Sequence, residues 1–282
     1  MNSLHDLDSS IDRWFREDIG EGDHTTFSTI PKDATGSAKL LVKEAGILAG
    51  LEVAQRIFHR FDQEIQVLPL MEDACAISPG DLVFRVSGKV HTILQCERLV
   101  LNVMQRMSGI ATTTFAYVNL LEGTGTKILD TRKTTPGMRF LEKEAVRLGG
   151  GVNHRFGLYD MIMIKDNHID FAGGIEQAIS ACKAYLERKK LKLDMVVETR
   201  SLEDIEVVLS IGGILRIMLD NFSVELTREA VQLIDHRVET ESSGGITRET
   251  IRSYAECGVD YISVGALTHQ INSLDLSMKA DF

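Results

Sequence analysis

The segments DMVVET (194–199) and LRIMLD (215–220) are strand-like runs separated by a helical pattern, and the second half of the chain repeats this alternation. Alternating strands and helices are typical of parallel βα units. We therefore predict an α/β fold with a parallel sheet in this half of the chain. The other strand-like runs are KILDT (127–131), DMIMIK (160–165), HRVETES (236–242) and DYISVG (260–265).

Each of these runs finishes in polar residues or in glycine. From Lys165 onward the ends follow one another at spacings of 33, 22, 23 and 22 residues, about one βα unit each. In an α/β barrel the carboxyl ends of the strands meet on one face, and that face carries the active site. One polar strand end is most simply a solvated loop, but a series at matching positions predicts a shared pocket. The ends are Arg132-Lys133, Lys165, Glu198, Asp220, Ser243-Gly244-Gly245 and Gly265.

The helical patterns between the runs carry boundary signals. Ser201 with Asp204 fits a capping box, and Ser223 fits the N-cap of the next helix. Thr247 fits the N-cap of a helix over RETIRSYAECG (248–258). We expect these helices to join the strands of the predicted sheet.

The first half of the chain has a different pattern. Short strand candidates alternate with turn signals, and one helix is predicted over residues 51–61, which indicates a small α+β unit. A long helical pattern over 92–121, with a break expected near Gly109, connects the two halves. The strand candidates are SAKLLV (37–42), EIQVLPL (64–70) and DLVFRV (81–86).

Composition excludes several classes of function. The 282 residues are 44% hydrophobic and 26% charged, and the net charge of -10 argues against a broad surface for nucleic acid or anionic membrane. The four cysteines form no CxxC pair, which argues against a zinc knuckle or a disulfide framework. Neither a signal peptide nor a long apolar run is evident, so the cytoplasm is the expected location.

A basic cluster opposes the negative net charge. Arg132 and Lys133 lie among three threonines in a strand end that runs into a Pro-Gly turn, and His154, Arg155 and Lys165 follow. Arginine suits bidentate capture of carboxylate or phosphate, whereas lysine acts as a mobile point charge. A pocket of this composition predicts a ligand with several negative charges.

Glu198 and Asp220 end neighbouring strands, and three interpretations of this pair remain open. The carboxylates could hold Mg²⁺ together with substrate oxygens. They could stabilise positive charge that develops on a sugar ring. They could also simply pair with the lysines and arginines of the basic cluster.

The last two strand ends carry glycines. Ser243, Gly244 and Gly245 lead straight into the predicted helix after Thr247, and Gly265 follows the last strand. Small residues let backbone N–H groups approach a phosphate, and barrels often bind phosphate after their final strands. The residues alone therefore indicate a barrel enzyme for a polyanionic, phosphorylated substrate with Mg²⁺.

A resemblance to a known family extends this interpretation. The run LDTRKTTPGMRFLEKEAVRLGGGVNHRFGLYDMIMIKDNHI (129–169) carries TRKTTPG and KDNH, the most specific of the shared motifs. The likeness continues through EDIGEGDHTT (17–26), CERLVLNVMQRMSGIAT (96–112), ESSGGIT (241–247) and GVDYISVGALTHQINSLDLSMK (258–279). In these motifs the chain closely resembles quinolinate phosphoribosyltransferase, also called nicotinate-nucleotide pyrophosphorylase (carboxylating).

The resemblance implies an architecture and an assembly. It implies an N-terminal α/β sandwich over 1–112, joined by the C-terminal tail 270–282, and an open, TIM-like α/β barrel over 113–269. Family members are homodimers with shared active sites, sometimes assembled into hexamers. Arg98 corresponds to an arginine that completes the site of the partner subunit.

The resemblance also implies a reaction, the transfer of phosphoribose from phosphoribosyl pyrophosphate to quinolinate. The products are nicotinate mononucleotide, pyrophosphate and CO₂, in NAD biosynthesis, and Mg²⁺ is the implied metal. Catalytic positions of the family match Lys133, Lys165, Glu198 and Asp220, and the two acids also match the metal site. Substrate-binding positions match Arg98, Arg132, His154, Arg155, Ser243, Gly244, Gly245 and Gly265.

Competing interpretations come from the same superfamily. A phosphoribosyltransferase for nicotinate or another acid would need fewer cations than the set formed by Arg98, Arg132 and Arg155. A repurposed relative, such as the homologue associated with molybdenum transport, would keep the fold but alter this cationic set. A purely structural protein would have no reason to place charges at successive strand ends.

Overall fold

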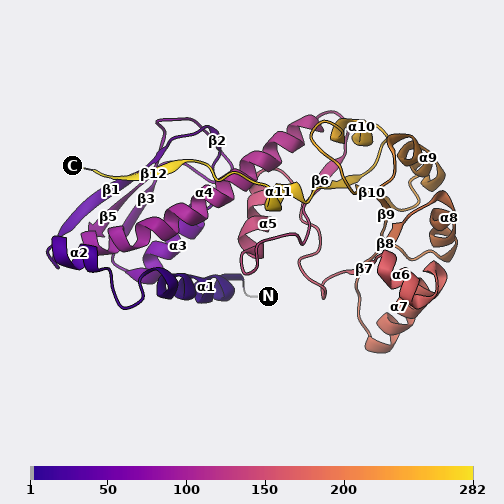
Figure 1. The fold of residues 1–282 in the computed structure, drawn as a ribbon, viewed down its shortest axis with the longest axis horizontal. Helices are drawn as coiled ribbons and strands as arrows, with labels where there is room; N and C mark the ends of the chain where they lie inside the picture. Colours follow the sequence, from indigo (N-terminus) through magenta and orange to yellow (C-terminus); the bar gives the residue numbers. More distant parts are fainter. Residues whose placement is uncertain (1–2, 282) are drawn as a thin grey trace. The chain divides into compact units, whose positions relative to one another are not determined.

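The computed structural model describes residues 3–281, which group into two compact units (Figure 1). Unit 1 contains the described residues up to Phe115, together with Thr134–Gly150 and the residues from Leu267 onward. Unit 2 contains Ala116–Lys133 and Gly151–Ala266. The division falls near the expected boundaries, except that 134–150, expected in the barrel part, groups with unit 1.

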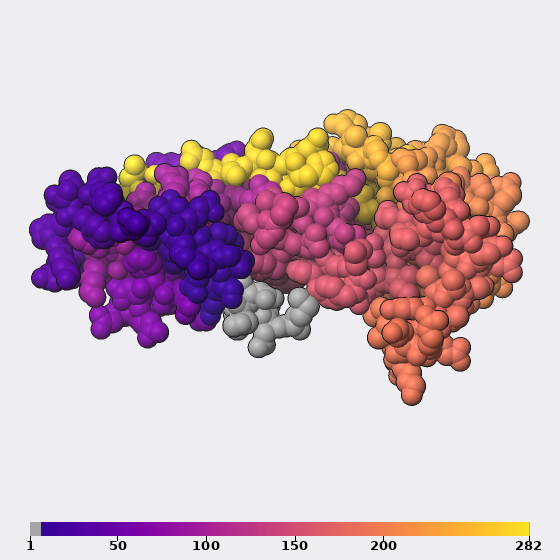
Figure 2. Space-filling model, turned by 60° about the horizontal axis from the view of Figure 1, so that its bottom comes forward, coloured from indigo at the N-terminus to yellow at the C-terminus, as the bar shows by residue number. Residues whose placement is uncertain are grey.

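A four-stranded antiparallel sheet in the order β12-β1-β5-β3 is the centre of unit 1. Alternate residues of β1, namely Ala38, Leu40 and Val42, are buried, as expected for a strand with one face toward a core. The C-terminal strand β12 pairs with β1, and Figure 2 shows the yellow C-terminal segment along one side of this unit. The strands are β1 (Thr35–Val42), β3 (Gln66–Pro69), β5 (Leu82–Lys89) and β12 (Leu276–Ala280), with a separate pair β2 (Gly46–Ile47) and β4 (Ala76–Ile77).

Helices supply the other half of the core of unit 1. In α3 the buried residues Ala54, Ile57 and Phe58 recur at helical spacing, and the Phe58 ring meets Phe84 of β5 edge to face, with centroids 6.1 Å apart. Burial of each such large side chain contributes about 1.5–3 kcal/mol. The helices are α1 (Ser3–Asp18), α2 (His24–Thr29), α3 (Leu51–Phe61), α4 (Val90–Leu120), α5 (Arg139–Leu148) and α11 (Ala266–His269).

Helix α4 is continuous, so the break expected near Gly109 was wrong. A Cβ atom at position 109 would lie 2.1 Å from the main-chain oxygen of Asn272. The C-terminal segment therefore lies directly against the helix at this glycine, and the Leu274 amide donates to the Gln105 carbonyl (2.9 Å). Gly109 permits a close backbone approach and does not end the helix.

Helix α5 packs against α4 within unit 1. A Cβ atom on Gly149, the C-cap of α5, would lie 2.4 Å from the Ala111 carbonyl oxygen. The buried Glu142 carboxylate accepts hydrogen bonds from the Arg106 guanidinium of α4. This packing explains why 134–150 groups with unit 1.

Unit 2 contains the predicted parallel sheet, in the order β6-β11-β10-β9-β8-β7. The strands β6 and β7 do not pair with each other, so the barrel is open, as predicted. Every residue of β8 is buried, which is typical of a parallel sheet covered on both faces. In Figure 1 the helices α7 to α9 lie on the outer side of these strands. The strands are β6 (Lys127–Leu129), β7 (Ile162–Ile164), β8 (Met195–Thr199), β9 (Arg216–Asp220), β10 (Glu239–Ser243) and β11 (Tyr261–Ser263).

Two of the three predicted helix caps are confirmed. Ser201 accepts a hydrogen bond from the Asp204 amide, and Ser223 accepts one from the Leu226 amide. The cap at Thr247 was wrong, because residues 248–250 form a turn and the helix begins only at Ile251. The helices of unit 2 are α6 (Asp166–Ala172), α7 (Ile175–Lys189), α8 (Leu202–Ile211), α9 (Val224–Ile234) and α10 (Ile251–Ala255).

No helix within residues 3–281 is both long enough and apolar enough to cross a membrane.

We expect Gly109→Ala to destabilise unit 1 by about 2 kcal/mol, because the added methyl group overlaps a main-chain oxygen. Asn102→Ala, at an exposed position of the same helix, is the matched control and should leave stability unchanged or slightly higher. Urea unfolding of both variants checks this expectation. A Gly109→Ala protein as stable as the control would contradict the close contact.

Candidate active site

The carboxyl ends of β7, β8 and β9 bring three predicted site residues together, namely Lys165, Glu198 and Asp220. Lys165 follows β7, and its Nζ lies 3.0 Å from Oε2 of Glu198 near the end of β8. The Glu198 side chain is 5% exposed, whereas the Lys165 side chain is 44% exposed. The carboxylate is thus held in the sheet, and the ammonium group reaches toward solvent.

The KDNH motif fixes the backbone beside this pair. Helix α6 begins directly after Lys165, and the Lys165 amide donates to Nδ1 of His168 (3.0 Å). The Asp166 amide points at the other oxygen of Glu198, at 3.4 Å. These contacts orient the first turn of α6 and the Lys165 backbone.

Among the described residues, Asp220 at the end of β9 lacks the ion-pair partner that Glu198 has, and its environment disfavours the charged form of its side chain. Burial and the neighbouring Glu198 charge raise its pKa above the ordinary value, and the Asn221 amide and Lys165 only partly offset them. No lysine or arginine within residues 3–281 forms an ion pair with Asp220. The suggestion that both acids pair with basic residues therefore holds for Glu198 and not for Asp220.

The glycine loop after β10 lies beside Asp220. Ser243 pairs in register with Asp220, and Gly244 and Gly245 have φ values of +94° and +60°. A Cβ atom on Gly244 would lie 2.2 Å from Oδ1 of Asn221, so only glycine fits there. The sequence analysis was wrong that this loop leads straight into a helix, because α10 begins only at Ile251. A helix dipole therefore does not contribute at this loop. The part of the loop that a ligand could contact is its tightly turned backbone.

Gly265 ends the loop after β11, next to the SGG loop in the sheet order. It directly precedes the short helix α11. The two glycine-containing ends therefore lie on neighbouring strands, as predicted.

The basic side of the site contains two arginines close enough to repel each other. Arg155 is 9% exposed, and burial, together with the Arg132 charge, lowers the pKa of its guanidinium. Its Nη1 donates to the Met161 carbonyl oxygen (3.1 Å), but its buried Nε has no hydrogen-bond partner within residues 3–281. Arg132 is exposed, in the loop after β6, next to the exposed Lys133. In the described part of the chain neither arginine forms an ion pair, and the charge of Asp160 only partly offsets burial and the repulsion from Arg132 at Arg155.

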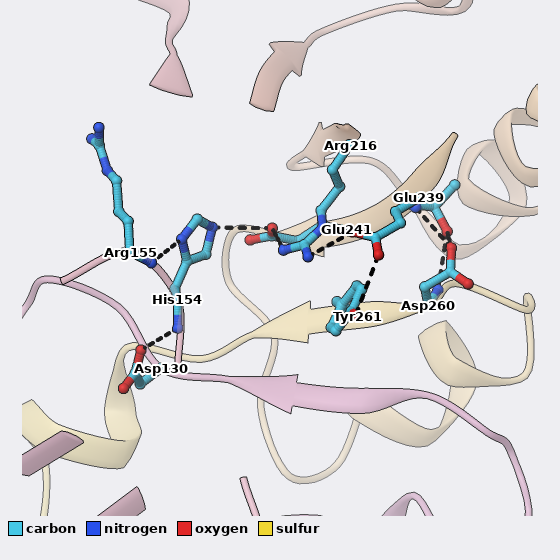
Figure 3. Close-up of polar contacts among 9 residues, drawn as sticks. Asp130, His154, Arg155, Arg216, Glu239, Glu241, Asp260 and Tyr261 are labelled. Carbon is cyan, nitrogen blue, oxygen red and sulfur yellow. Dashed lines mark hydrogen bonds and ion pairs between the residues drawn. The ribbon is translucent and has the colours of Figure 1, made fainter. Parts of the chain in front are cut away.

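His154 is buried between these arginines and the barrel interior. Its amide donates to the Asp130 carboxylate (2.8 Å), and its Nε2 lies 3.2 Å from Oε2 of Glu241 on β10 (Figure 3). Its Nδ1 accepts the Arg155 amide proton (2.7 Å). The ring therefore contacts the protein on both sides.

Arg98 lies in unit 1, on α4, and its side chain is exposed. Among residues 3–281 no hydrogen bond or ion pair involves this side chain. All the other predicted site residues lie in unit 2.

An ionic cluster on β9 and β10 was not predicted from the sequence. Arg216 and Glu241 are buried, and Arg216 also pairs with the partly exposed Glu239. A signal was present, because these residues interrupt strand runs that are buried on both faces, and buried charges require partners.

Two family models match the chain. The N-terminal domain of quinolinate phosphoribosyl transferase matches residues 23–108, and the C-terminal domain of the same family matches residues 110–279. This chain belongs to the quinolinate phosphoribosyl transferase family. The expected N-terminal α/β sandwich and C-terminal open barrel are the architecture of its solved members.

Individual members of the family are similar over almost the whole chain. Quinolinate phosphoribosyltransferase [decarboxylating] 1b of Nicotiana tabacum is 44% identical over 292 aligned positions, which cover 98% of this chain and 83% of that protein. The probable nicotinate-nucleotide pyrophosphorylase [carboxylating] of Bacillus subtilis is 41% identical, and the aligned region covers 99% of this chain and 94% of that protein. The crystal structure of NadC from Streptococcus pyogenes superposes with a TM-score of 0.93 at 41% identity, over 99% of this chain and 97% of that one.

The raised pKa of Asp220 gives a testable stability effect in this family member. An acid with a higher pKa in the folded than in the unfolded state disfavours folding when ionised, and the penalty disappears as the pH falls through the folded-state pKa. Asp220→Asn should therefore unfold a few degrees higher than the wild type at pH 7, and the difference should shrink in acid. Thermal unfolding across pH checks this expectation.

The exposed Asp194, just before β8, provides the control variant Asp194→Asn, which should show no such gain. Glu198→Gln should also show none, because it removes the partner of Lys165. A lower unfolding temperature for Asp220→Asn at pH 7 would mean that the Asp220 charge stabilises the fold.

Proposed function

We propose that this chain transfers the phosphoribosyl group of phosphoribosyl pyrophosphate to quinolinate, with loss of CO₂, to give nicotinate mononucleotide for NAD biosynthesis. The observation that carries the proposal is the pair Arg132 and Arg155, whose repulsion Asp160 only partly offsets, at the same end of the parallel sheet as a glycine loop and two carboxylates. Two adjacent cations match a dicarboxylate better than a monocarboxylate. The names of relatives that are 41–44% identical give the same activity.

The site residues divide the reaction between them. Arg132 and Arg155 bind the two carboxylates, and Ser243, Gly244, Gly245 and Gly265 bind phosphate through their backbone. Pyrophosphate leaves C1 of the ribose, and Glu198 or Asp220 stabilises the positive charge that develops on the sugar. The pyridine nitrogen then forms the new bond to C1.

Decarboxylation follows from the product of that step. The pyridinium ring accepts the electron pair of the bond to the 2-carboxylate, CO₂ leaves, and the ring carbon takes up a proton. Lys133 and Lys165 are placed at strand ends where they can neutralise the substrate charges during both steps. His154 belongs to the proposed substrate-binding residues.

Mg²⁺ is the metal that fits the acids of the site. No group of three or more His, Cys, Asp or Glu side chains within residues 3–281 is arranged to hold a metal on its own. Mg²⁺, however, commonly uses one or two carboxylates together with substrate phosphates and water. Asp220 and Glu198 would hold it, which would relieve the repulsion that raises the Asp220 pKa. The metal would supply charge neutralisation to the pyrophosphate group.

The remaining expectations are part of the proposal. The enzyme acts in the cytoplasm, as a homodimer that can assemble further to a hexamer. The site of one subunit is completed by Arg98 of the other, which agrees with the exposed side chain of Arg98 and its lack of an ion pair within residues 3–281.

Turnover tests the proposed reaction. Purified protein with Mg²⁺ and phosphoribosyl pyrophosphate should convert quinolinate, and not nicotinate, to nicotinate mononucleotide, with one CO₂ per nucleotide. Product from nicotinate alone would overturn the substrate, and no product from folded protein in either case would favour a repurposed relative.

Arg132→Ala should lower kcat/KM for quinolinate without unfolding the protein. The decrease should correspond to a loss of about 2–5 kcal/mol of transition-state stabilisation. Arg188→Ala, an exposed arginine near the end of α7, is the control and should keep full activity.

A mixing experiment tests the shared site. Arg98→Ala and Arg132→Ala should each be inactive alone. After the two proteins are mixed and their subunits exchange, each mixed dimer has one site with both arginines intact, so about a quarter of wild-type activity should return. If Arg98 served its own chain, both sites of a mixed dimer would be defective and no activity would return.

A further inference from the structure

The barrel interior contains a continuous chain of polar contacts, of which only His154 has a place in the proposed reaction (Figure 3). It runs from His154 to Glu241, from Glu241 to Arg216, and from Arg216 to Glu239. We propose that Glu241 is a positioning residue, which acts through His154 to hold Arg155 in the orientation that binds a carboxylate of the pyridine substrate. This inference rests on the proposed function.

The contacts of His154 support an indirect role for this residue. Because Nδ1 accepts the Arg155 amide proton at 2.7 Å, Nδ1 carries no hydrogen, and the ring proton lies on Nε2 and points at Glu241. The side chain is 4% exposed. In Figure 3 the Arg155 side chain extends away from the ring, with its guanidinium far from the polar chain. His154 thus holds the backbone of Arg155, while Arg155 itself reaches for the ligand.

Glu241 stabilises the tautomer of His154 that carries its proton on Nε2. Its side chain is fully buried, and the single oxygen Oε2 accepts from His154 and from Nη1 of Arg216 (3.0 Å). Burial by itself raises the pKa of this carboxyl, but the hydrogen bonds from His154 and Arg216 and the Arg216 charge outweigh burial and leave the pKa below its ordinary value. An ionised carboxylate accepts hydrogen bonds and donates none, so it accepts from Nε2–H and stabilises this tautomer.

The position of Glu241 in the sheet links the two halves of the site. His154 lies two residues after Val152, which bridges to Leu129 at the edge strand β6. Since β11 lies between β6 and β10, the contact from His154 to Glu241 spans two strands of the open barrel. Glu241 is also two residues before Ser243. One strand therefore fixes both the loop that carries Arg155 and the loop expected to bind phosphate.

Stability alone does not explain this glutamate. Its second oxygen, Oε1, is buried and has no hydrogen-bond partner within residues 3–281. Buried charges with incomplete hydrogen bonding are often replaced by apolar side chains without loss of stability. Arg216 does not depend on Glu241 either, because Glu239 accepts hydrogen bonds from its Nε and Nη2 (3.0 and 2.8 Å).

Glu241→Gln tests the proposal, with Glu239→Gln as the matched control. Glu239 and Glu241 lie on the same strand, and each change removes one carboxylate partner of Arg216. Of the two, only Glu241 contacts His154. We expect the Kd and KM for quinolinate to rise about tenfold or more in Glu241→Gln, because a charged hydrogen-bond acceptor is lost. The KM for phosphoribosyl pyrophosphate and the unfolding temperature should not change. Glu239→Gln should bind quinolinate like the wild type.

A double-mutant cycle tests the route through His154. His154→Phe should weaken quinolinate binding to a similar extent, and adding Glu241→Gln should have little further effect. Additive effects would mean that Glu241 acts independently of His154 and would overturn the proposal. An equal loss of quinolinate binding in Glu239→Gln and Glu241→Gln would also overturn it. So would a loss of stability that accompanies the change in KM.

Nitrogen NMR of histidine separates this inference from the proposed reaction. The wild-type spectrum should show His154 with its proton on Nε2, whether or not the enzyme turns over quinolinate, and Glu241→Gln should show a mixture of tautomers. A wild-type protein that shows this tautomer but binds no quinolinate would refute the proposed function and leave the contact with Glu241 intact. A His154 tautomer that is unchanged in Glu241→Gln would refute the role of Glu241, even in an enzyme that is active on quinolinate.

Discussion

The register of the parallel strands β8, β9 and β10 is the constraint on which the rest of the site depends. Ser243 pairs with Asp220, and Glu198 pairs with Met218, so the strand ends are level with one another. Because side chains alternate between the two faces of a strand, a slip of one residue would exchange the interior residues for those that face the helices. Register therefore fixes both the ends that form the site and the ionic cluster beneath it.

This constraint produces a site with separated charges. On one side Glu198 is paired with Lys165, while Asp220 remains unpaired and close to Glu198. On the other side Arg132 and Arg155 repel each other. Ligands of opposite charge would make each group more favourable. A substrate pair that brings carboxylates to the arginines, and a cation to the acids, would relieve both repulsions and would let a chain with a net charge of -10 attract anions.

The strands of the parallel sheet and the helix starts at Ser201 and Ser223 followed from local patterns, because polarity patterns and N-cap residues act over a few positions. The break at Gly109 was wrongly predicted because the reason for that glycine is a contact with Asn272, far away in sequence. The helix start after Thr247 was wrong for a different reason, since the cap signal is common in turns. The ends of β7 to β10 were predictable as one group because the parallel topology brings equivalent ends together.

The partner choices within the site were not predictable from the sequence. Nothing local distinguishes Glu198, which pairs with Lys165, from Asp220, which does not. The contact between His154 and Glu241 spans two strands, so it depends on the curvature of the open barrel. The family resemblance assigned His154 to the substrate, yet both of its ring nitrogens contact protein groups. Sequence motifs thus mark the residues that meet the ligand and those that support them alike, and only the three-dimensional contacts separate the two roles. In this barrel the supporting groups are buried charges, whose cost to stability is explained if they hold the arginine that the substrate needs.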